Sequence, residues 1–449
     1  MKIIIVGAGE IGRHLATSLS LEAHSISVIE FHASLARELE DSLDARVLNA
    51  DGTEVEVLIE AGVASCDLFL ALTSHNSVNI IACSLAKKMG AKKVISRVHP
   101  GVQREEWLFD YRGHFGIDHL FSSERLSAIA LAKFIRNPDC LAVEEIARGR
   151  IELQQVRIAD ESDVSGQEIR ALKLPERTRL ASVSRGGDHF IPKADTELLG
   201  GDVVTVFGEP RKLRTLSNRL QGGKGENSSL RVVIFGGGEY GFTLAQMLES
   251  WNFRVRIFEK DPERARELTD KLANTTVINV DGTVLAELEE EQVGEADFFV
   301  ACSGSDEDNV MTCLQANTLG AGNCLTLIHR ADYADAISGS GKHFGMLAAV
   351  SPRDATAREI NRFITSERFH VIKELDAGDV VETVIGKGSS VAGQAIEDVE
   401  WPQGCVLVAR LQGVHADVPG PLDVLSPGDT VYAMVNTKAR KAFLKLVSS

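Results

Sequence analysis

The chain has 449 residues, a formal net charge of −16 and 44% hydrophobic residues. This length predicts about three ordinary domains, and the acidic balance argues against binding to nucleic acid, which requires a basic surface. The sequence contains no run of 18 apolar residues that could span a membrane, and its seven cysteines form no Cys-x-x-Cys pair. We therefore expect a cytoplasmic globular protein whose cysteines are small buried hydrophobic residues.

The first predicted element is a buried parallel strand over residues 3–6 that runs directly into a glycine-rich turn. Gly7, Gly9 and Gly12 form a Gly-x-Gly-x-x-Gly pattern, and an amphipathic helical pattern follows. In a dinucleotide-binding turn the first glycine permits the tight turn, the second lets backbone approach a pyrophosphate, and the third lets the helix pack on the strand. The N–H groups at the start of the helix would then face the phosphates. Alone, the pattern is weak evidence, because glycine-rich turns after strands are common.

An acidic residue strengthens this interpretation. Glu30 ends the next predicted strand, over residues 27–30. From that position a carboxylate can accept hydrogen bonds from the ribose hydroxyls of adenosine, although a solvated strand end is the alternative. The same carboxylate would repel a ribose 2′-phosphate. The sequence therefore favours NAD, NADH or adenosine nucleotides over NADP.

Further strands alternate with helical patterns up to residue 135. These strands are predicted over 45–49, 68–72, 94–98 and 117–121, and a helix capped by Ser122 over 122–135. Strand alternating with helix indicates a doubly wound parallel sheet. The pattern then changes to short β-like runs and one helix, at 151–158, 180–184, 203–207 and 211–220. This second part is typical of a small α+β domain.

The whole arrangement then occurs a second time. Gly236, Gly238, Gly241 and Glu259 each lie 229 residues after their first-half counterparts, Asp51-Gly52-Thr53 recurs at 281–283, and His-Phe-Gly at 114–116 recurs at 343–345. The chain is therefore built of two duplicated halves. We predict Rossmann domains at 1–137 and 230–365, small α+β domains at 138–221 and 366–449, and a flexible linker at 222–229.

This order of domains resembles the TrkA-type regulators of bacterial potassium uptake, which carry tandem RCK domains. The resemblance covers nearly the whole chain and implies that each half is a Rossmann domain followed by a C-terminal lobe. It further implies a homotetrameric ring, peripheral to the inner face of the plasma membrane, that gates the transporter TrkH or TrkG. NAD, NADH, ATP or ADP would be the regulating nucleotides. The resemblance implies no catalytic residue and no metal ligand.

By resemblance, nucleotide contacts fall on the glycine turn, the acid after the second strand, the loops after the third and fourth strands and a basic residue on the fifth. In the first half these are Gly7, Gly9, Glu10, Ile11, Gly12, Glu30, Asp51, Thr53, Thr73, Ser74 and Arg97. In the second half they are Gly236, Gly238, Glu239, Tyr240, Gly241, Glu259, Asp281, Thr283, Ser303 and Gly304. For the two Asp-Gly-Thr segments an ordinary turn is the alternative.

The loop after the fourth strand differs between the halves. Residues 73–79 contain no carboxylate, whereas the matching loop contains Asp306, Glu307 and Asp308. Carboxylates near a phosphate would repel it. On this basis the first site should accept ATP or ADP, and the second should prefer NAD or NADH or bind weakly. The alternative is that the three acids only stabilise the start of the following helix.

Two other classes of protein are compatible with a single glycine-rich turn. An NAD-dependent dehydrogenase normally joins one cofactor domain to a distinct substrate domain with an acid, a base or a metal, whereas this chain repeats the cofactor domain. A nucleotide-responsive repressor would need a basic helix-turn-helix, which the sequence lacks. We therefore expect a regulatory nucleotide sensor, with the dehydrogenase as the alternative.

Overall fold

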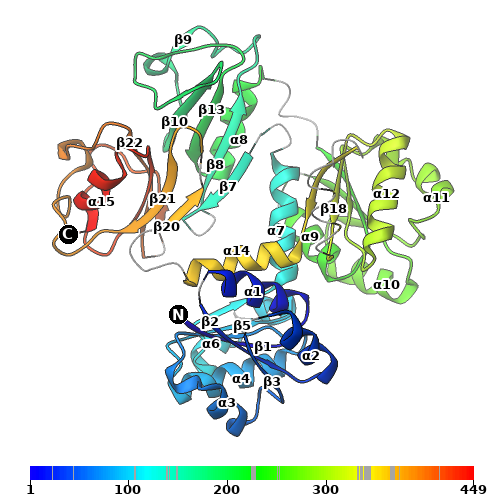
Figure 1. Cartoon of the computed structure of the whole chain (residues 1–449). Coiled ribbons are helices and arrows are strands. Elements are labelled where there is room, and N and C mark those ends of the chain that lie inside the picture. The colour runs from blue at the N-terminus through cyan, green and yellow to red at the C-terminus, as the bar shows by residue number, and fades with distance from the viewer. Residues whose placement is uncertain are drawn as a thin grey trace. The chain divides into compact units, whose positions relative to one another are not determined.

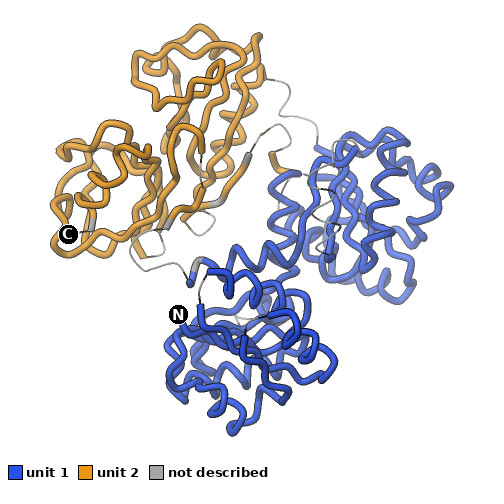
Figure 2. Tube along the Cα trace, in the orientation of Figure 1, with its two compact units in different colours: residues 1–135, 229–364 blue, residues 136–228, 365–449 orange. Residues whose placement is uncertain are grey.

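The computed structural model describes most of the chain (Figure 1). The described residues are 1–22, 24–43, 45–105, 108–137, 140, 142–147, 150–223, 229–249, 251, 253–330, 333, 337, 345–364, 370–373, 375–413 and 415–448. Most of the predicted linker at 222–229, and residues 343–344 of the repeated triplet, lie outside them. The chain divides into two compact units, one of residues 1–135 and 229–364 and one of residues 136–228 and 365–449 (Figure 2). One unit thus holds both predicted Rossmann domains, while the limits of the individual domains stay predictions.

The first unit contains a six-stranded parallel sheet in the order β3-β2-β1-β4-β5-β6. Its strands are β1 (Lys2–Val6), β2 (Ser25–Glu30), β3 (Arg46–Asn49), β4 (Leu68–Ala71), β5 (Lys93–Arg97) and β6 (His119–Phe121). Ile4 of β1 is fully buried and pairs with Ser27 of β2 and Phe69 of β4. The strand order reverses between β1 and β4. At such a switch point, open parallel sheets bind ligands beyond the carboxyl ends of their strands.

A second parallel sheet in the same unit repeats this order as β16-β15-β14-β17-β18-β19. Its strands are β14 (Arg231–Phe235), β15 (Arg254–Phe258), β16 (Thr275–Ile278), β17 (Phe298–Ala301), β18 (Asn323–Leu327) and β19 (Met346–Val350). Each strand of the second half therefore takes the place of its first-half counterpart. The prediction of two Rossmann-like parallel-sheet domains is confirmed.

Helices connect the strands of both sheets. Those of the first half are α1 (Glu10–Leu21), α2 (Ala33–Ser42), α3 (Val55–Ala61), α4 (Asn76–Met89), α5 (Pro100–Arg104), α6 (Tyr111–Phe115) and α7 (Ser123–Arg136). Those of the second half are α9 (Glu239–Glu249), α10 (Pro262–Lys271), α11 (Leu285–Glu290), α12 (Asp306–Leu319) and α14 (Pro352–Ile364). The Ser122 hydroxyl accepts a 3.2 Å hydrogen bond from the Arg125 N–H at the start of α7, as the predicted cap requires.

The last helix of each half packs against the other half's Rossmann domain. α7 follows β6, but its fully buried Leu131 belongs to the hydrophobic core that contains Val232 of β14. Conversely, α14 follows β19, and its fully buried Ile360 belongs to the core that contains Ile5 of β1. This reciprocal exchange joins the two Rossmann domains, because each core is completed by a helix from the other half.

The second unit contains two five-stranded antiparallel sheets, in the orders β11-β10-β13-β8-β7 and β20-β21-β24-β22-β23. The elements of its first part are β7 (Ala142–Ile146), β8 (Ile151–Arg157), β9 (Gln167–Glu168), β10 (Thr178–Arg185), β11 (Asp188–Phe190), β12 (Glu197–Leu198), β13 (Val203–Gly208) and α8 (Pro210–Leu220). Those of its second part are β20 (His370–Lys373), β21 (Asp379–Val384), β22 (Cys405–Gln412), β23 (His415–Asp417), β24 (Thr430–Val435) and α15 (Arg440–Ser448). Phe207 and Met434 lie in one shared core. The two small α+β domains therefore pack against each other through a shared core.

Candidate functional site

The two glycine-rich turns have the same backbone geometry. Gly7 has a φ of +96°, and Gly236 has a φ of +100°, a left-handed conformation that favours glycine. A Cβ atom on Gly12 would overlap the carbonyl oxygen of Gly7, and one on Gly241 would overlap that of Gly236. The first and third glycines are therefore required by the turn itself and by the packing of α1 and α9.

The middle glycine of each turn has a different environment. Gly9 and Gly238 are exposed, and a Cβ atom on either would meet no atom within 4 Å. Packing against the described residues therefore does not require glycine at these two positions. They lie at the start of α1 and α9, where backbone N–H groups are free to bind an anion. This open cradle fits the pyrophosphate of a nucleotide.

The acids predicted to bind ribose are hydrogen-bonded to the glycine turns. Glu30 is only 6% exposed, and its carboxylate accepts hydrogen bonds from the N–H groups of Ala8 at 2.6 Å and His32 at 2.7 Å. Glu259 accepts the equivalent bonds from Gly237 at 2.9 Å and Asp261 at 2.8 Å. Each carboxylate oxygen keeps a second lone pair for a ribose hydroxyl. In this arrangement the acid also holds the glycine turn against the end of the second strand.

The two Asp-Gly-Thr segments form local turns beside the first strand of each sheet. Asp51 accepts hydrogen bonds from the Thr53 N–H at 2.8 Å and the Thr53 hydroxyl at 2.7 Å. Asp281 does the same with Thr283, and the hydroxyl bond is the largest of the effects that lower the pKa of Asp281. A Cβ atom on Gly52 would overlap the side chain of Val6. The turn is therefore ordered without a ligand, and its role in binding stays a prediction.

An asparagine that sequence reasoning missed positions the loop after the fourth strand. Asn79 is 1% exposed and accepts a 3.0 Å hydrogen bond from the Thr73 N–H, while its amide donates to the carbonyl oxygens of Thr73 and Arg97. Asn309 makes the same three contacts, with Ser303 and with Leu327. The signal was present in the sequence, because both loops end in asparagine at matching positions.

Arg97 and Tyr240, which are predicted nucleotide contacts, both interact with Glu124 at the start of α7. Arg97 pairs with Glu124 of α7 at 3.1 Å. Burial alone would raise the pKa of Glu124, but the charge of Arg97 and a 2.7 Å hydrogen bond from Ser122 hold that pKa below its usual value. Burial raises the pKa of Tyr240, which interacts electrostatically with both residues. A nucleotide phosphate near Arg97 would therefore share this guanidinium with Glu124.

The acids of the second-half loop differ from one another in their contacts. Asp306 is 4% exposed and accepts hydrogen bonds from the His329 and Arg330 N–H groups at 2.8–3.1 Å. Asn76 fills the same position in the first half, where it accepts a 2.8 Å bond from the His99 N–H. Glu307 contacts Arg330 at 3.8 Å. Two of the three acids therefore contact the loop after β18, a structural role that differs from the predicted one at the start of the following helix.

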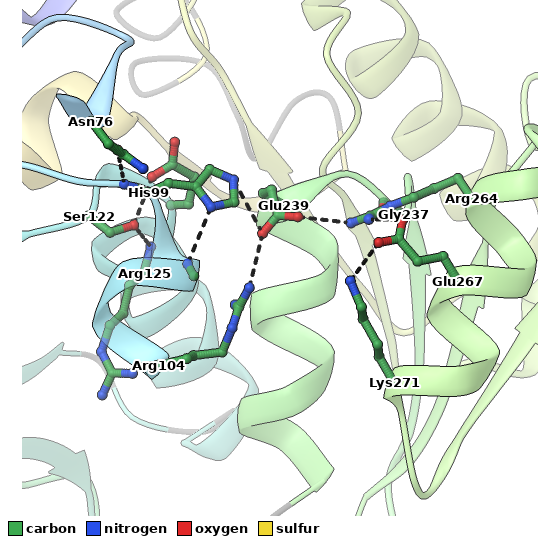
Figure 3. Close-up of polar contacts among 12 residues, drawn as sticks. Asn76, His99, Arg104, Ser122, Arg125, Gly237, Glu239, Arg264, Glu267 and Lys271 are labelled. Carbon is green, nitrogen blue, oxygen red and sulfur yellow. Dashed lines mark hydrogen bonds and ion pairs between the residues drawn. The ribbon is translucent and has the colours of Figure 1, made fainter. Parts of the chain in front are cut away.

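Other predicted contacts have unequal surroundings in the two halves. Glu10 is exposed, and Ile11 is 8% exposed in the core completed by α14. Ser74 is exposed, and its hydroxyl lies 3.2 Å from His75 Nδ1. Gly304 has open space around it. Glu239, the counterpart of Glu10, is instead surrounded by basic side chains from both Rossmann domains (Figure 3).

Among the described residues, no group of three or more His, Cys, Asp or Glu side chains could hold a metal ion. Among the described helices, none is both long enough and apolar enough to cross a membrane.

Comparison with known proteins finds matches along the whole chain. The TrkA-N domain model matches residues 3–122 and 232–352, and the TrkA-C domain model matches residues 153–221 and 380–448. The Trk system potassium uptake protein TrkA of Halomonas elongata is 32% identical, over 98% of this chain and 97% of its own. That of Vibrio alginolyticus is 30% identical, over 98% and 96%. A structure of the GsuK channel bound to NAD is 19% identical and superimposes with a TM-score of 0.60, over 99% of this chain and 78% of that chain.

Proposed function

This chain belongs to the TrkA family of Trk system potassium uptake proteins, and we propose that it is the nucleotide-binding regulatory subunit of a potassium transporter. In this proposal it binds adenine nucleotides on its two glycine turns and gates a membrane subunit of the TrkH or TrkG type. It acts from the cytoplasm, at the inner face of the membrane, and catalyses no reaction.

The observation that carries the proposal is the open cradle that occurs twice. In each Rossmann domain an exposed middle glycine lies in a turn whose neighbouring N–H group donates to the carboxylate that we propose binds ribose. No described atom lies within 4 Å of a Cβ atom placed on Gly9 or Gly238, so packing against the described residues does not require glycine there. A glycine that the fold does not need is explained by close approach of a ligand. NAD, NADH, ADP and ATP all carry the required pyrophosphate and ribose diol.

Regulation requires that a nucleotide binds two shapes of the protein with different affinities. The exchanged helices α7 and α14 provide a physical connection, because each starts at the carboxyl edge of one sheet and completes the core of the other domain. Arg97 pairs with Glu124 at the start of α7, so a phosphate that competes for Arg97 would act on that helix. A coupling of about 1–3 kcal/mol is typical of such systems.

A homotetrameric ring is the proposed assembly. Each Rossmann domain exposes apolar side chains at equivalent positions of two helices, Val55 and Ile81 in the first and Leu285 and Met311 in the second. Exposed apolar groups that recur at equivalent positions favour contact with further Rossmann domains. Light scattering after size exclusion should give a mass of about four chains. A clean monomer at micromolar concentration would exclude the ring.

Nucleotide binding can be tested with a matched pair of substitutions, Gly9→Asp and Gly238→Asp. Aspartate is favoured at the start of a helix, so each variant should fold, while its carboxylate would occupy the phosphate position. Calorimetry with ADP and NAD should show loss of one site in each single variant and of both in the double variant. Gly9→Ala and Gly238→Ala are the uncharged controls. Unchanged binding in the folded double variant would remove both turns from the site.

Transporter control can be tested in cells. The wild-type chain should co-purify with a multi-span membrane protein and support potassium uptake, and the double aspartate variant should co-purify but lose the response to nucleotide. Failure to recover any membrane protein would contradict the proposed partner. A spectrophotometric assay for hydride transfer tests the dehydrogenase alternative, because a regulator should leave bound NADH unoxidised.

A further inference from the structure

The carboxylate of Glu239, at the start of α9, is surrounded by basic side chains from both Rossmann domains (Figure 3). Arg264 of α10 approaches it at 3.1 Å, and its Nε donates a 2.8 Å hydrogen bond to the carbonyl oxygen of Gly237. His99 and Arg104, which follow β5 of the first domain, approach at 3.6 Å each. The second glycine turn is therefore bordered by groups from the first half of the chain.

Three permanent cations gather beside the second glycine turn. Arg104, Arg264 and Lys271 all lie over the ring of Phe242, at 5.0, 5.7 and 5.9 Å from its centroid. Glu267 pairs with Arg264 and Lys271, whereas Glu239 is the acid that Arg104 approaches. Glu259 is a further acid at this turn, where it accepts a hydrogen bond from the Gly237 N–H. A phosphate that took the place of the Glu239 carboxylate would have Arg104 and Arg264 beside it.

Glu239 holds His99 and Arg104 loosely, although its Oε1 atom accepts a 3.1 Å hydrogen bond from Arg264. Its Oε2 atom is buried and has no hydrogen-bond partner among the described residues. The 3.6 Å separations from His99 and Arg104 to this oxygen are longer than a hydrogen bond. A buried carboxylate oxygen without a hydrogen bond is costly. A ligand that gave His99 and Arg104 a better-placed anion would therefore compete with it.

The first glycine turn lacks this arrangement. Leu35 and Ser42 occupy the positions of Arg264 and Lys271. Arg13 lies near this turn and pairs with Glu38 at 2.8 Å. Glu10, the counterpart of Glu239, is exposed. Among the residues that the structure describes, this cationic cluster therefore borders the second turn and not the first.

We propose that His99 and Arg104 of the first Rossmann domain bind the terminal phosphate of a nucleoside di- or triphosphate on the second glycine turn, and that Glu239 holds these cations when no nucleotide is bound. The proposal rests on the proposed function, since it assumes nucleotide binding at this turn. ADP or ATP displaces Glu239 from the cations, so that the terminal phosphate takes the place of this carboxylate between the two Rossmann domains. NAD carries no terminal phosphate and leaves Glu239 on the cations.

This assignment reverses the order expected from the sequence, in which the acidic loop made the second site the weaker one for ATP and ADP. The structure supplies the reason. Asp306 binds the backbone of the loop after β18, and Glu307 contacts Arg330. The cations that border the second turn come from elements far apart in the sequence.

The test measures binding of ADP and NAD by calorimetry on the full-length chain with Gly9→Asp in the background, which leaves the second site alone. Arg104→Gln should weaken ADP binding by about tenfold, as expected for one charge pair a few ångströms apart in partial contact with water. Arg104→Lys should restore most of the affinity. Arg46→Gln, which removes a cation of the same domain at an exposed pair with Glu60, is the matched control and should change it less than twofold.

Glu239→Gln is the second arm, because it removes the competing anion. It should tighten ADP binding several-fold and change NAD binding much less. The proposal would be overturned if Arg104→Gln bound ADP with an affinity within twofold of its parent. It would also be overturned if Glu239→Gln weakened ADP binding. Absence of ADP binding in the Gly9→Asp background would also overturn it. In that case, nucleotide binding that persists in the Gly238→Asp variant would show that the first turn binds nucleotide, and the proposed function would stand.

Discussion

Helices α7 and α14 each complete the core of the Rossmann domain in the other half of the chain. A substitution in one half should therefore destabilise the domain of the other half. Leu131 belongs to the first half in sequence but is fully buried in the core of the second sheet, with Val232. We predict that Leu131→Ala destabilises the second Rossmann domain. Ile360→Ala in α14 is the reciprocal variant and should destabilise the first domain, whose core contains Ile360.

The magnitude follows from the burial. Both side chains are 0% exposed, so truncation removes apolar contacts and leaves a cavity that the surrounding core can only partly fill. Leu→Ala and Ile→Ala substitutions at such positions cost about 2–5 kcal/mol. A loss of about 3 kcal/mol raises the population of the locally opened domain by a factor of about 150. This is large enough to detect domain by domain.

Hydrogen exchange with mass spectrometry is the suitable measurement, since a chain with several domains does not unfold in two states. In Leu131→Ala, faster exchange should appear in β14, β15 and β17, with β1, β2 and β4 close to wild type. Ile360→Ala should show the opposite pattern. If Leu131→Ala instead accelerated hydrogen exchange in β1, β2 and β4, α7 would pack in the domain of its own half, and the reciprocal packing of α7 and α14 would be refuted.

Three further outcomes follow from local geometry. Gly12→Ala should lower stability and abolish nucleotide binding, because its Cβ would overlap a carbonyl oxygen, whereas Gly9→Ala should keep the fold; circular dichroism and calorimetry on both variants check this. The pKa of Glu124 is lowered in the folded chain, so its pair with Arg97 contributes stability above the usual glutamate pKa and loses it as pH falls through the folded value. The free energy of unfolding, measured with denaturant between pH 7 and pH 3, should therefore depend less on pH in Glu124→Gln than in the wild-type chain. Burial raises the pKa of the Cys83 thiol, so this thiol should resist a maleimide at pH 8 until the chain is unfolded, and rapid labelling of the native protein would contradict its burial.

The sequence by itself determined the elements and their order. The glycine turns, the acids at the ends of the second strands and the Ser122 cap depend on residues close together in the chain, so local pattern was sufficient. The duplication then determined the architecture, because two sets of matching elements must form two matching sheets. These predictions are confirmed by β1 and β14, each of which is followed by a turn with a left-handed first glycine and then by α1 or α9.

Only the tertiary structure decided which partners these elements take. The apolar positions of α7 show that one face of this helix is buried. Either of the two similar sheets could pack against that face, and the periodicity of apolar residues around Leu131 would be the same for both. The same limit applies to Arg104 and Glu239, which are far apart in sequence and meet through the exchange. It also bears on dissection of the chain, because separate halves cut near the linker would each expose the face of an exchanged helix. Local sequence encodes what a segment buries, and the packing of the whole chain selects what it is buried against.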